Sequence, residues 1–482
     1  MKRVFGAIML LCLLVNVGLT QTLGHSINGR VRDSLGASIT GAAVTLKNSA
    51  TGLELSALTN QEGRFFFTGF VPAQCQVAVD AAGFKTLVTG FDAKVSASSD
   101  LDLRLDAQID DDGETSTQGM EMASVEPAVD PSEPAATKDA AAVEPNYDVV
   151  QVFYATDRRA SGRKQPAAYY TEDRAPDENL TYGACQVSIP RNHEKGQLEQ
   201  RWSLVRRLWK DNPEKHVVLL SVDETEHGAF LQELSSSIAQ STEKQAFVFI
   251  HGFNTSFEEA ARRTAQVAYD LGFHVAPILY SWPSKTCLFS PRCYPADEES
   301  VEWTTQHLKS FLQEIAAKSG ATRVHLIAHS IGNRALTNAL SKIAGEQQGK
   351  AKTSFHQVIL GAPDIDTSLL AQRAAALKRT CDRLTLYVSP RDWVLDLSKL
   401  VHMAARAGNG ASVSGIDTID VSNLDPGHSP LANPSILCDI TRLFRSGQEP
   451  DQRCGLVKQG QSNPFCWAFN RADVVKCSDP GN

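Results

Sequence analysis

The chain has 482 residues, of which 42% are hydrophobic and 21% are charged, a composition typical of folded globular protein and a length that allows about three domains. Its formal net charge is −8, but residues 106–146 contain eleven Asp and Glu against one Lys, so the rest of the chain carries about +2. Because no part is strongly basic, we exclude nucleic acid as a partner.

The first twenty residues, MKRVFGAIMLLCLLVNVGLT, have the order of a secretory signal peptide. Lys2 and Arg3 supply the positive start, an almost wholly apolar run continues to Val17, and polar residues begin at Thr20. We therefore expect residues 1–20 to be a signal peptide and the protein to be secreted or periplasmic. An uncleaved membrane anchor is the alternative, although the apolar run is shorter than the ~20 residues that a span needs.

The cysteine pattern fits an oxidising compartment. Cys287 and Cys293 are the best candidate pair, because the Pro-containing loop CLFSPRC brings them close. The C-terminal tail, residues 446–482, has little periodicity, and we expect disulfides of its cysteines to fix it to the body. No C-x-x-C spacing occurs and the histidines lie apart from the cysteines, so we expect no structural zinc site.

Residues 22–107 alternate apolar and polar side chains between Gly, Asn and Asp turns, which predicts an all-β sandwich. Eight residues should face its core: Ile27, Val31, Val44, Leu46, Phe65, Phe67, Val77 and Val79. The phrases GRVRDSLG, GAAVTL, NQEGRFFF and AAGF resemble the carboxypeptidase regulatory-like domain, a small transthyretin-type sandwich. The resemblance implies a binding or spacer module without chemistry of its own, for which an envelope component is a candidate partner.

Residues 108–146 are acidic and rich in Pro, Ala, Ser and Thr. Such a segment buries too little apolar surface to offset its chain entropy, so we expect a disordered linker between two domains.

From residue 147 to 445, compact β-branched segments alternate with helical patterns. The expected strands are VVQVFYATD, HVVLLSVDE, AFVFIHGFN, VAPILYSWP, RVHLIAHS, HQVILGAPD and RLTLYVSP. The expected helices include residues 256–270, 299–318, 332–345 and 366–378. This alternation predicts an α/β domain with a doubly wound, mostly parallel sheet, whose chemistry gathers at the carboxyl ends of the strands.

The segment AHSIG places Ser330 where one of these strands ends and a helix begins. A sharp strand-to-helix turn would lift the serine hydroxyl above the sheet, as in the G-x-S-x-G nucleophile turn of hydrolases. Ala328 stands where that pattern has its first glycine, and a methyl group is small enough for the same turn. We therefore interpret Ser330 as a candidate nucleophile.

About eighty residues upstream, HGFN follows the strand FVFI. An HG turn after an early strand donates one backbone N–H to the oxyanion hole of an α/β hydrolase, and the residue after the nucleophile donates the other. These donors would be Phe253, or alternatively Asn254, and Ile331.

A nucleophilic serine needs a base, and the base needs an orienting acid. In the order Ser, acid, His, the acid is predicted to be Asp392, after the strand RLTLYVSP, and the base His428, in a Gly/Pro loop. Asp364 is the rival acid, unless it only caps the next helix. His402 is the rival base, but it lies in a helical stretch.

The segments FVFIHGFN, YSWPS, HLIAHSIGNRAL, ILGAPDID, LYVSPRD and GHSPL resemble, in this order, a bacterial α/β-hydrolase family of unknown function in the esterase/lipase superfamily. The A-H-S-x-G turn is that family's own form, and YSWPS is a family signature. The resemblance implies acyl-ester chemistry with Ser330, Asp392 and His428 as the triad.

The sequence therefore favours an exported serine hydrolase that cleaves carboxylic esters through an acyl-enzyme, without a metal or organic cofactor. Its expected partner is a small-molecule or lipid-like acyl ester. An acyltransferase would use the same triad, and an inactive envelope binding or scaffold protein on a hydrolase fold is the alternative from another class.

Overall fold

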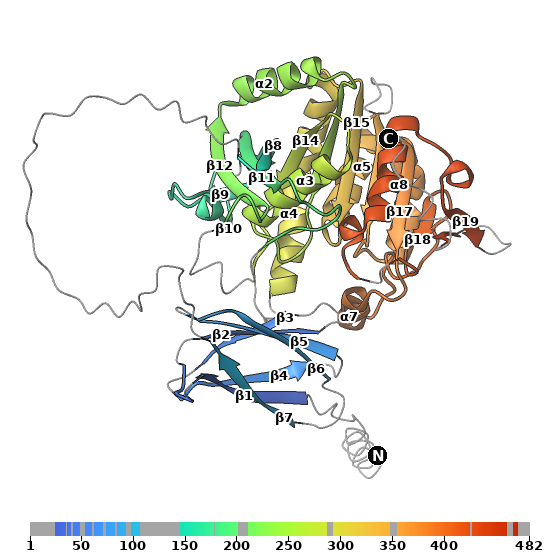
Figure 1. Ribbon diagram of the computed structural model, residues 1–482. Helices are drawn as coiled ribbons and strands as arrows, with labels where there is room; N and C mark the ends of the chain where they lie inside the picture. Colours follow the sequence, from blue (N-terminus) through green and yellow to red (C-terminus); the bar gives the residue numbers. More distant parts are fainter. Residues whose placement is uncertain are drawn as a thin grey trace, which may run out of the picture. The chain divides into compact units, whose positions relative to one another are not determined.

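The computed structural model describes residues 25–106 and 145–470, apart from residues 35, 40–41, 49–53, 60–61, 71–73, 82–83, 93–97, 178, 201–210, 287–292, 348–353, 425–426 and 460–465. These residues form two compact units, one before and one after residues 107–144 in the sequence; Figure 1 labels the strands and helices of each. The expected signal peptide and nearly all of the expected linker lie outside the described residues. In the described part of the chain, no helix has the length and apolar character needed to cross a membrane.

The N-terminal unit is a sandwich of two sheets with strand orders β4-β1-β7 and β3-β2-β5-β6. The strands are β1 (His25–Asp33), β2 (Ala43–Asn48), β3 (Glu54–Leu58), β4 (Arg64–Phe70), β5 (Gln74–Asp80), β6 (Leu87–Asp92) and β7 (Ser98–Leu105). All pairs are antiparallel except β1 with β7. The eight residues predicted to face the core are all buried in it, so the period-2 pattern identified the inward faces correctly.

The C-terminal unit is built on one sheet of eleven strands, in the order β12-β11-β8-β14-β13-β15-β16-β17-β18-β20-β19. Its strands are β8 (Tyr147–Thr156), β11 (Thr181–Pro190), β12 (Val218–Thr225), β13 (Gln245–Ile250), β14 (Val275–Ser281), β15 (Arg323–His329), β16 (Phe355–Gly361), β17 (Cys381–Val388), β18 (Asp417–Asp420), β19 (Leu456–Gln459) and β20 (Cys466–Phe469). A separate two-stranded ribbon joins β9 (Arg158–Ala160) to β10 (Tyr170–Arg174).

The sheet is parallel from β8 through β20 and antiparallel at both edges, where β12 and β11 precede β8 and where β19 pairs with β20. The central strands are buried on both faces, which explains their continuous apolar sequences. The expectation for the tail was incomplete, because part of residues 446–482 joins the sheet as β19 and β20. Both strands have only four residues, too few to reveal a period.

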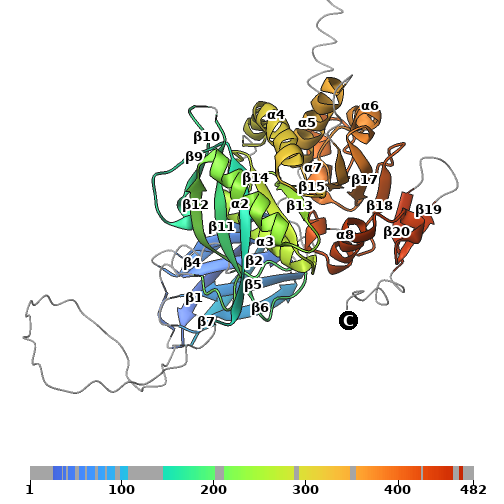
Figure 2. The same cartoon turned by 90° about the horizontal axis from the view of Figure 1, so that it is seen from above.

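Helices cover both faces of this sheet. They are α2 (His227–Gln240), α3 (Phe257–Asp270), α4 (Cys293–Lys318), α5 (Gly332–Glu346), α6 (Thr367–Lys378), α7 (Trp393–His402) and α8 (Pro434–Ser446). One core cluster contains apolar residues of α2, α4, α5 and α6, and the other contains those of α3 and α8. Figure 2 shows α4, α5 and α6 on one side of the strands and α3 and α8 on the other.

The parallel strands bring their carboxyl ends to one edge of the sheet. The segments that follow these ends carry most of the chemically active side chains named above: His251 after β13, Ser330 after β15, Asp364 after β16, Asp392 after β17 and His428 after β18. In open α/β sheets this edge is where ligands bind, so the topology itself assembles the candidate site.

Candidate active site

Ser330 forms the turn between β15 and α5 with a backbone φ of +52°, a conformation that costs free energy for any residue with a Cβ. Four hydrogen bonds hold its backbone there. Its N–H donates to the carbonyl of Gly361 (3.0 Å). Its own carbonyl accepts from Nδ2 of Asn333 (2.9 Å) and from the N–H groups of Asn333 and Asp364 (each 3.2 Å). The surrounding structure therefore fixes a strained serine, as expected at a nucleophile turn.

Two glycines allow the Ser330 turn to pack against the HG turn. A Cβ on Gly332 would lie 2.2 Å from the carbonyl oxygen of His251, and a Cβ on Gly252 would lie 2.9 Å from Cβ of Ser330. Neither position tolerates a side chain, whereas Ala328 is fully buried with its methyl group accommodated. Close packing therefore requires glycine at positions 332 and 252. At position 328, where the G-x-S-x-G pattern has its first glycine, alanine fits.

The structure brings Ser330, His428 and Asp392 together. Nδ1 of His428 lies 2.7 Å from Oδ2 of Asp392, and its Nε2 lies 2.9 Å from Oγ of Ser330. A carboxylate only accepts hydrogen bonds, so Nδ1 carries the hydrogen, and in the neutral ring Nε2 accepts from the serine hydroxyl. This is the arrangement that a general base for a serine nucleophile requires.

Asp392 has a second structural role that the sequence analysis did not anticipate. Its Oδ1 accepts from the N–H groups of Val394 (3.1 Å) and Leu395 (3.2 Å), so it is the N-cap of α7. The side chain is fully buried. Its Oδ1 caps the helix, and its Oδ2 accepts from His428. An aspartate is among the preferred residues at a helix N-cap, because its carboxylate accepts from the first free N–H groups of the helix.

The two expected oxyanion donors lie where the HG turn meets the Ser330 turn. Ile331 is the N-cap residue of α5. Phe253 directly follows Gly252, which packs so closely against Ser330 that an added Cβ would clash with it. Within the described residues, the N–H of neither Phe253 nor Ile331 has an acceptor in the protein. Asn254, the alternative donor, has a φ of +55°, so the HGFN segment bends sharply here.

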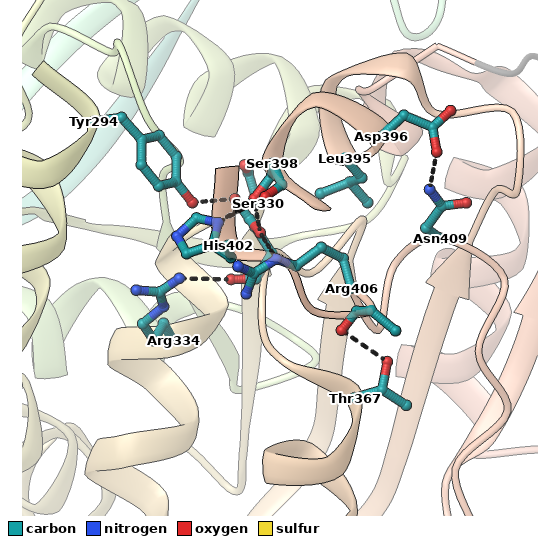
Figure 3. A network of polar contacts seen from close by, with 12 residues as sticks. Tyr294, Ser330, Arg334, Thr367, Leu395, Asp396, Ser398, His402, Arg406 and Asn409 are labelled. Atoms are coloured by element: carbon teal, nitrogen blue, oxygen red, sulfur yellow. Dashed lines mark hydrogen bonds and ion pairs between the residues drawn. The ribbon is translucent and has the colours of Figure 1, made fainter. Parts of the chain in front are cut away.

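The carboxylate of the rival acid, Asp364, contacts Ser398, Tyr294 and Arg406, which Figure 3 labels in one network with Ser330. Its carboxylate accepts from the hydroxyl groups of Ser398 (2.7 Å) and Tyr294 and lies 3.3 Å from Nε of buried Arg406. Among the described residues it has no contact with His428. It does not cap α6 either, because that role falls to Asp366. The Asp364 carboxylate therefore has partners other than the Ser330 hydroxyl and His428, although the Asp364 backbone N–H donates to the Ser330 carbonyl.

The rival base, His402, has ring contacts other than the Ser330 hydroxyl. It is on α7 as expected, with Nδ1 2.7 Å from the carbonyl of Ser398 and Nε2 2.8 Å from Glu298. Glu298 in turn accepts from Arg334 of α5 (Figure 3). These contacts tie α7 to α4 and α5, which is a structural role.

Two neighbours of the site were missed or only partly explained by the sequence. His329, the residue before the serine, is partly buried, and burial together with nearby His428 lowers its pKa to about 3. Trp282 of YSWPS is completely buried and donates from Nε1 to the carbonyl of His251 (2.8 Å), with the two rings stacked 5.0 Å apart. The tryptophan therefore supports the HG turn from within the core, as a floor under the site.

Cys293 is disulfide-bonded, but Cys287, its predicted partner, lies outside the described residues. In the tail, Cys454 is disulfide-bonded, whereas Cys466 is a free thiol, so not every cysteine there forms a bridge. Cys438, which precedes the tail in α8, is also a free thiol. Across the described ranges, no group of three or more His, Cys, Asp or Glu side chains is arranged to hold a metal ion.

A mostly parallel sheet covered by helices on both faces, with a strained serine turn at its carboxyl edge, defines the α/β-hydrolase class. Residues 226–435 match the family described as "Alpha/beta hydrolase of unknown function (DUF900)", and residues 26–106 match the "Carboxypeptidase regulatory-like domain". The two matches lie in the order that the sequence resemblance predicted.

Solved structures with detectable similarity match a short part of the chain. Catechol 1,2-dioxygenase from Pseudomonas arvilla C-1 is 16% identical over 21% of this chain and 58% of its own, with a TM-score of 0.16. Hydroxyquinol 1,2-dioxygenase from Pseudomonas putida DLL-E4 is 14% identical over 19% of this chain and 58% of its own, with a TM-score of 0.15. The pilus 2b backbone protein of group B streptococcus is 15% identical, covering 17% and 41%, with a TM-score of 0.16. No curated protein matches the sequence.

Proposed function

We propose that the C-terminal unit is a serine hydrolase that cleaves carboxylic esters. The observation that carries this proposal is the chain of two contacts from Ser330 Oγ to His428 Nε2 (2.9 Å) and from His428 Nδ1 to Asp392 Oδ2 (2.7 Å). The +52° φ of the serine supports it, because a strained backbone persists at a site that uses it.

In the proposed reaction, Oγ of Ser330 attacks the ester carbonyl while Nε2 of His428 takes the hydroxyl proton. Asp392 accepts from Nδ1 and stabilises the imidazolium that forms. The N–H groups of Phe253 and Ile331 stabilise the oxyanion, and no protein acceptor competes for them among the described residues. The imidazolium then protonates the leaving alcohol, and water attacks the acyl-enzyme with His428 as base.

We also propose that the protein is exported, on the strength of the signal-peptide pattern in residues 1–20. Its substrate class is a small or lipid-like acyl ester, since esters need no strong protonation of the leaving group. The scaffold alternative is less well supported, because a decayed site has no reason to keep the serine, base and acid within hydrogen-bond distance of one another.

The test is hydrolysis of p-nitrophenyl esters of increasing acyl length by the purified protein, with Ser330→Ala as the matched variant. We expect turnover by the wild type and a loss of about 10⁴-fold or more in kcat for Ser330→Ala. Alcohol acceptors added to the assay distinguish hydrolysis from acyl transfer by their products. A folded wild-type protein without turnover on any ester would favour the scaffold alternative.

A further inference from the structure

Arg158 lies in the segment after β8, at the same edge of the sheet as Ser330, and its side chain is buried with 1% of its surface exposed. β8 is parallel to β14, which in turn is parallel to β13, so the ends of these three strands meet. The position directly after β8 is therefore adjacent to the segments that follow β13 and β14. These segments are HGFN and SWPS.

All five N–H groups of the Arg158 guanidinium have an acceptor, and every acceptor is neutral. Nε donates to Oγ of Ser281 (2.8 Å), and Nη1 reaches the carbonyls of Thr171 and Ser284, each at 3.3 Å. Nη2 reaches the carbonyl of Thr255 (2.7 Å) and Nε2 of His251 (3.3 Å). Within the described residues, no carboxylate forms an ion pair with this buried cation.

The two contacts of Nη2 join the two ends of the HG turn. His251 begins the turn and Thr255 ends it, and Phe253, the proposed oxyanion donor, lies midway between them. Nδ1 of His251 faces the carbonyl of Gly252 (2.9 Å), so Nδ1 carries the hydrogen and Nε2 is left as an acceptor for the guanidinium. Burial and the charge of Arg158 lower the pKa of His251, which keeps this ring neutral.

A buried cation without an ion-pair partner is unfavourable, and burial lowers the pKa of Arg158 to about 10. The group still remains charged at neutral pH. Such a group is retained where its geometry is needed, because only arginine offers five donors in one rigid plane. Lysine, with three donors on a single atom, cannot reach the same five acceptors.

We propose that Arg158 is a positioning residue that holds residues 251–255 in the conformation that presents the Phe253 N–H to the oxyanion. The proposal rests on the proposed function of Ser330 and adds a determinant of catalysis from outside the triad. Arg158 should therefore affect kcat rather than substrate binding, since the oxyanion develops in the transition state and is absent from the bound ester.

The experiment compares Arg158→Met and Arg158→Lys with Arg262→Met. Arg262 is the control, because it is also fully buried but contacts the carbonyl of Glu199 (3.4 Å) and the carboxylate of Glu258 (3.9 Å), both outside residues 251–255. We expect both Arg158 variants to lose about 10²–10³-fold in kcat with little change in KM. Arg262→Met should lower thermal stability but leave kcat within about threefold of the wild type.

Chemical rescue adds a readout that a purely structural role would not move. In Arg158→Ala, millimolar methylguanidinium should restore part of kcat, whereas methylammonium at the same ionic strength should not, because it lacks the planar donor set. Loss of activity that methylguanidinium does not restore, together with an equal loss in Arg262→Met, would overturn the positioning role.

Hydrogen–deuterium exchange separates this proposal from the proposed function. Amides of residues 251–256 should exchange faster in Arg158→Met than in wild type or Arg262→Met, whether or not the wild type hydrolyses esters. If exchange is faster in Arg158→Met but the wild type does not hydrolyse esters, the hydrolase proposal is contradicted and the positioning role of Arg158 stands. Unchanged exchange in Arg158→Met would contradict the positioning role itself.

Discussion

Nε2 of His329, the residue directly before the serine, donates a hydrogen bond to the backbone carbonyl of His428 at 2.7 Å. The pKa of His329 is lowered to about 3, so the ring is neutral and keeps this donor hydrogen throughout the range in which proteins work. The contact ties the loop that carries the proposed base to the turn that carries the proposed nucleophile.

We predict that His329→Phe lowers kcat by up to about 10²-fold, since small displacements of a catalytic group are costly. His329→Gln, whose amide can still donate, should retain more activity. Steady-state kinetics on a soluble ester check this difference. Equal activity of His329→Phe and wild type would show that the tie does not position His428.

A pH dependence of stability follows from the same ring. The folded-state pKa of about 3 lies below the unfolded value of about 6.5, so the unfolded chain takes up a proton first as the pH falls. The contribution of neutral His329 to stability is therefore complete above pH ~6.5 and decreases between that pH and ~3. Urea unfolding at pH 7 and pH 5 should show a smaller decrease for His329→Phe than for wild type.

His193 gives the opposite dependence. It is buried between Glu199 (2.8 Å) and Asp270 (3.0 Å), and these carboxylates raise its pKa to about 9 against the effect of burial. Its contribution to stability is present below pH ~6.5, decreases as the unfolded chain loses its proton, and is lost above about pH 9. Wild type should therefore lose more stability between pH 7 and pH 10 than His193→Gln; an equal loss would contradict this assignment.

Two glycines of α5 provide a packing test. Gly332→Ala places a methyl group 2.2 Å from the His251 carbonyl, so we expect destabilisation of about 1–3 kcal/mol and a loss of turnover as the HG turn moves. Gly345→Ala, in the same helix with no heavy atom within 4 Å of the added Cβ, should stabilise by about 0.5–1 kcal/mol. Denaturant unfolding of both variants checks the contrast, and the idea fails if both behave alike.

The two roles of Asp392 can be separated by substitution. Asp392→Asn keeps an oxygen that can cap α7 but cannot hold His428 in the correct tautomer, so kcat should fall by about 10⁴-fold with little loss of stability. Asp392→Ala should lose the cap as well, at a cost of about 1 kcal/mol. Asp364→Asn is the control: it should disturb the Arg406 contact while retaining most of kcat. Greater loss of activity in Asp364→Asn than in Asp392→Asn would make Asp364 the acid.

The sequence was sufficient for the features that depend on local patterns. Period-2 alternation located the sandwich core, and strand-to-helix punctuation located the Ser330 turn and the segments containing Asp392 and His428. It was insufficient for contacts between distant segments. Arg158 lies 93 positions before His251, and nothing in the sequence YATDRR pairs it with HGFN until the order of β8, β14 and β13 is known.

The sequence pattern also did not predict the short strands β19 and β20 or the antiparallel pairing at the edges of the sheet. The sequence analysis did not include β11 among the expected strands and did not distinguish the antiparallel edge strand β12 from the parallel strands. The double use of Asp392 was hidden for another reason. The sequence analysis assigned Asp392 to His428, and that role already explained an Asp after a strand end. The N-cap contacts with α7 therefore became apparent only in the structure.

The central claim is that Ser330 is a nucleophile activated by His428. Its most direct test is fluorophosphonate labelling of the purified protein, read by intact mass and by the mass of the Ser330 peptide. We predict stoichiometric labelling of Ser330 in wild type and none in Ser330→Ala, with much slower labelling in His428→Ala. Labelling that persists in Ser330→Ala, or a folded wild type that is never labelled, would contradict the account.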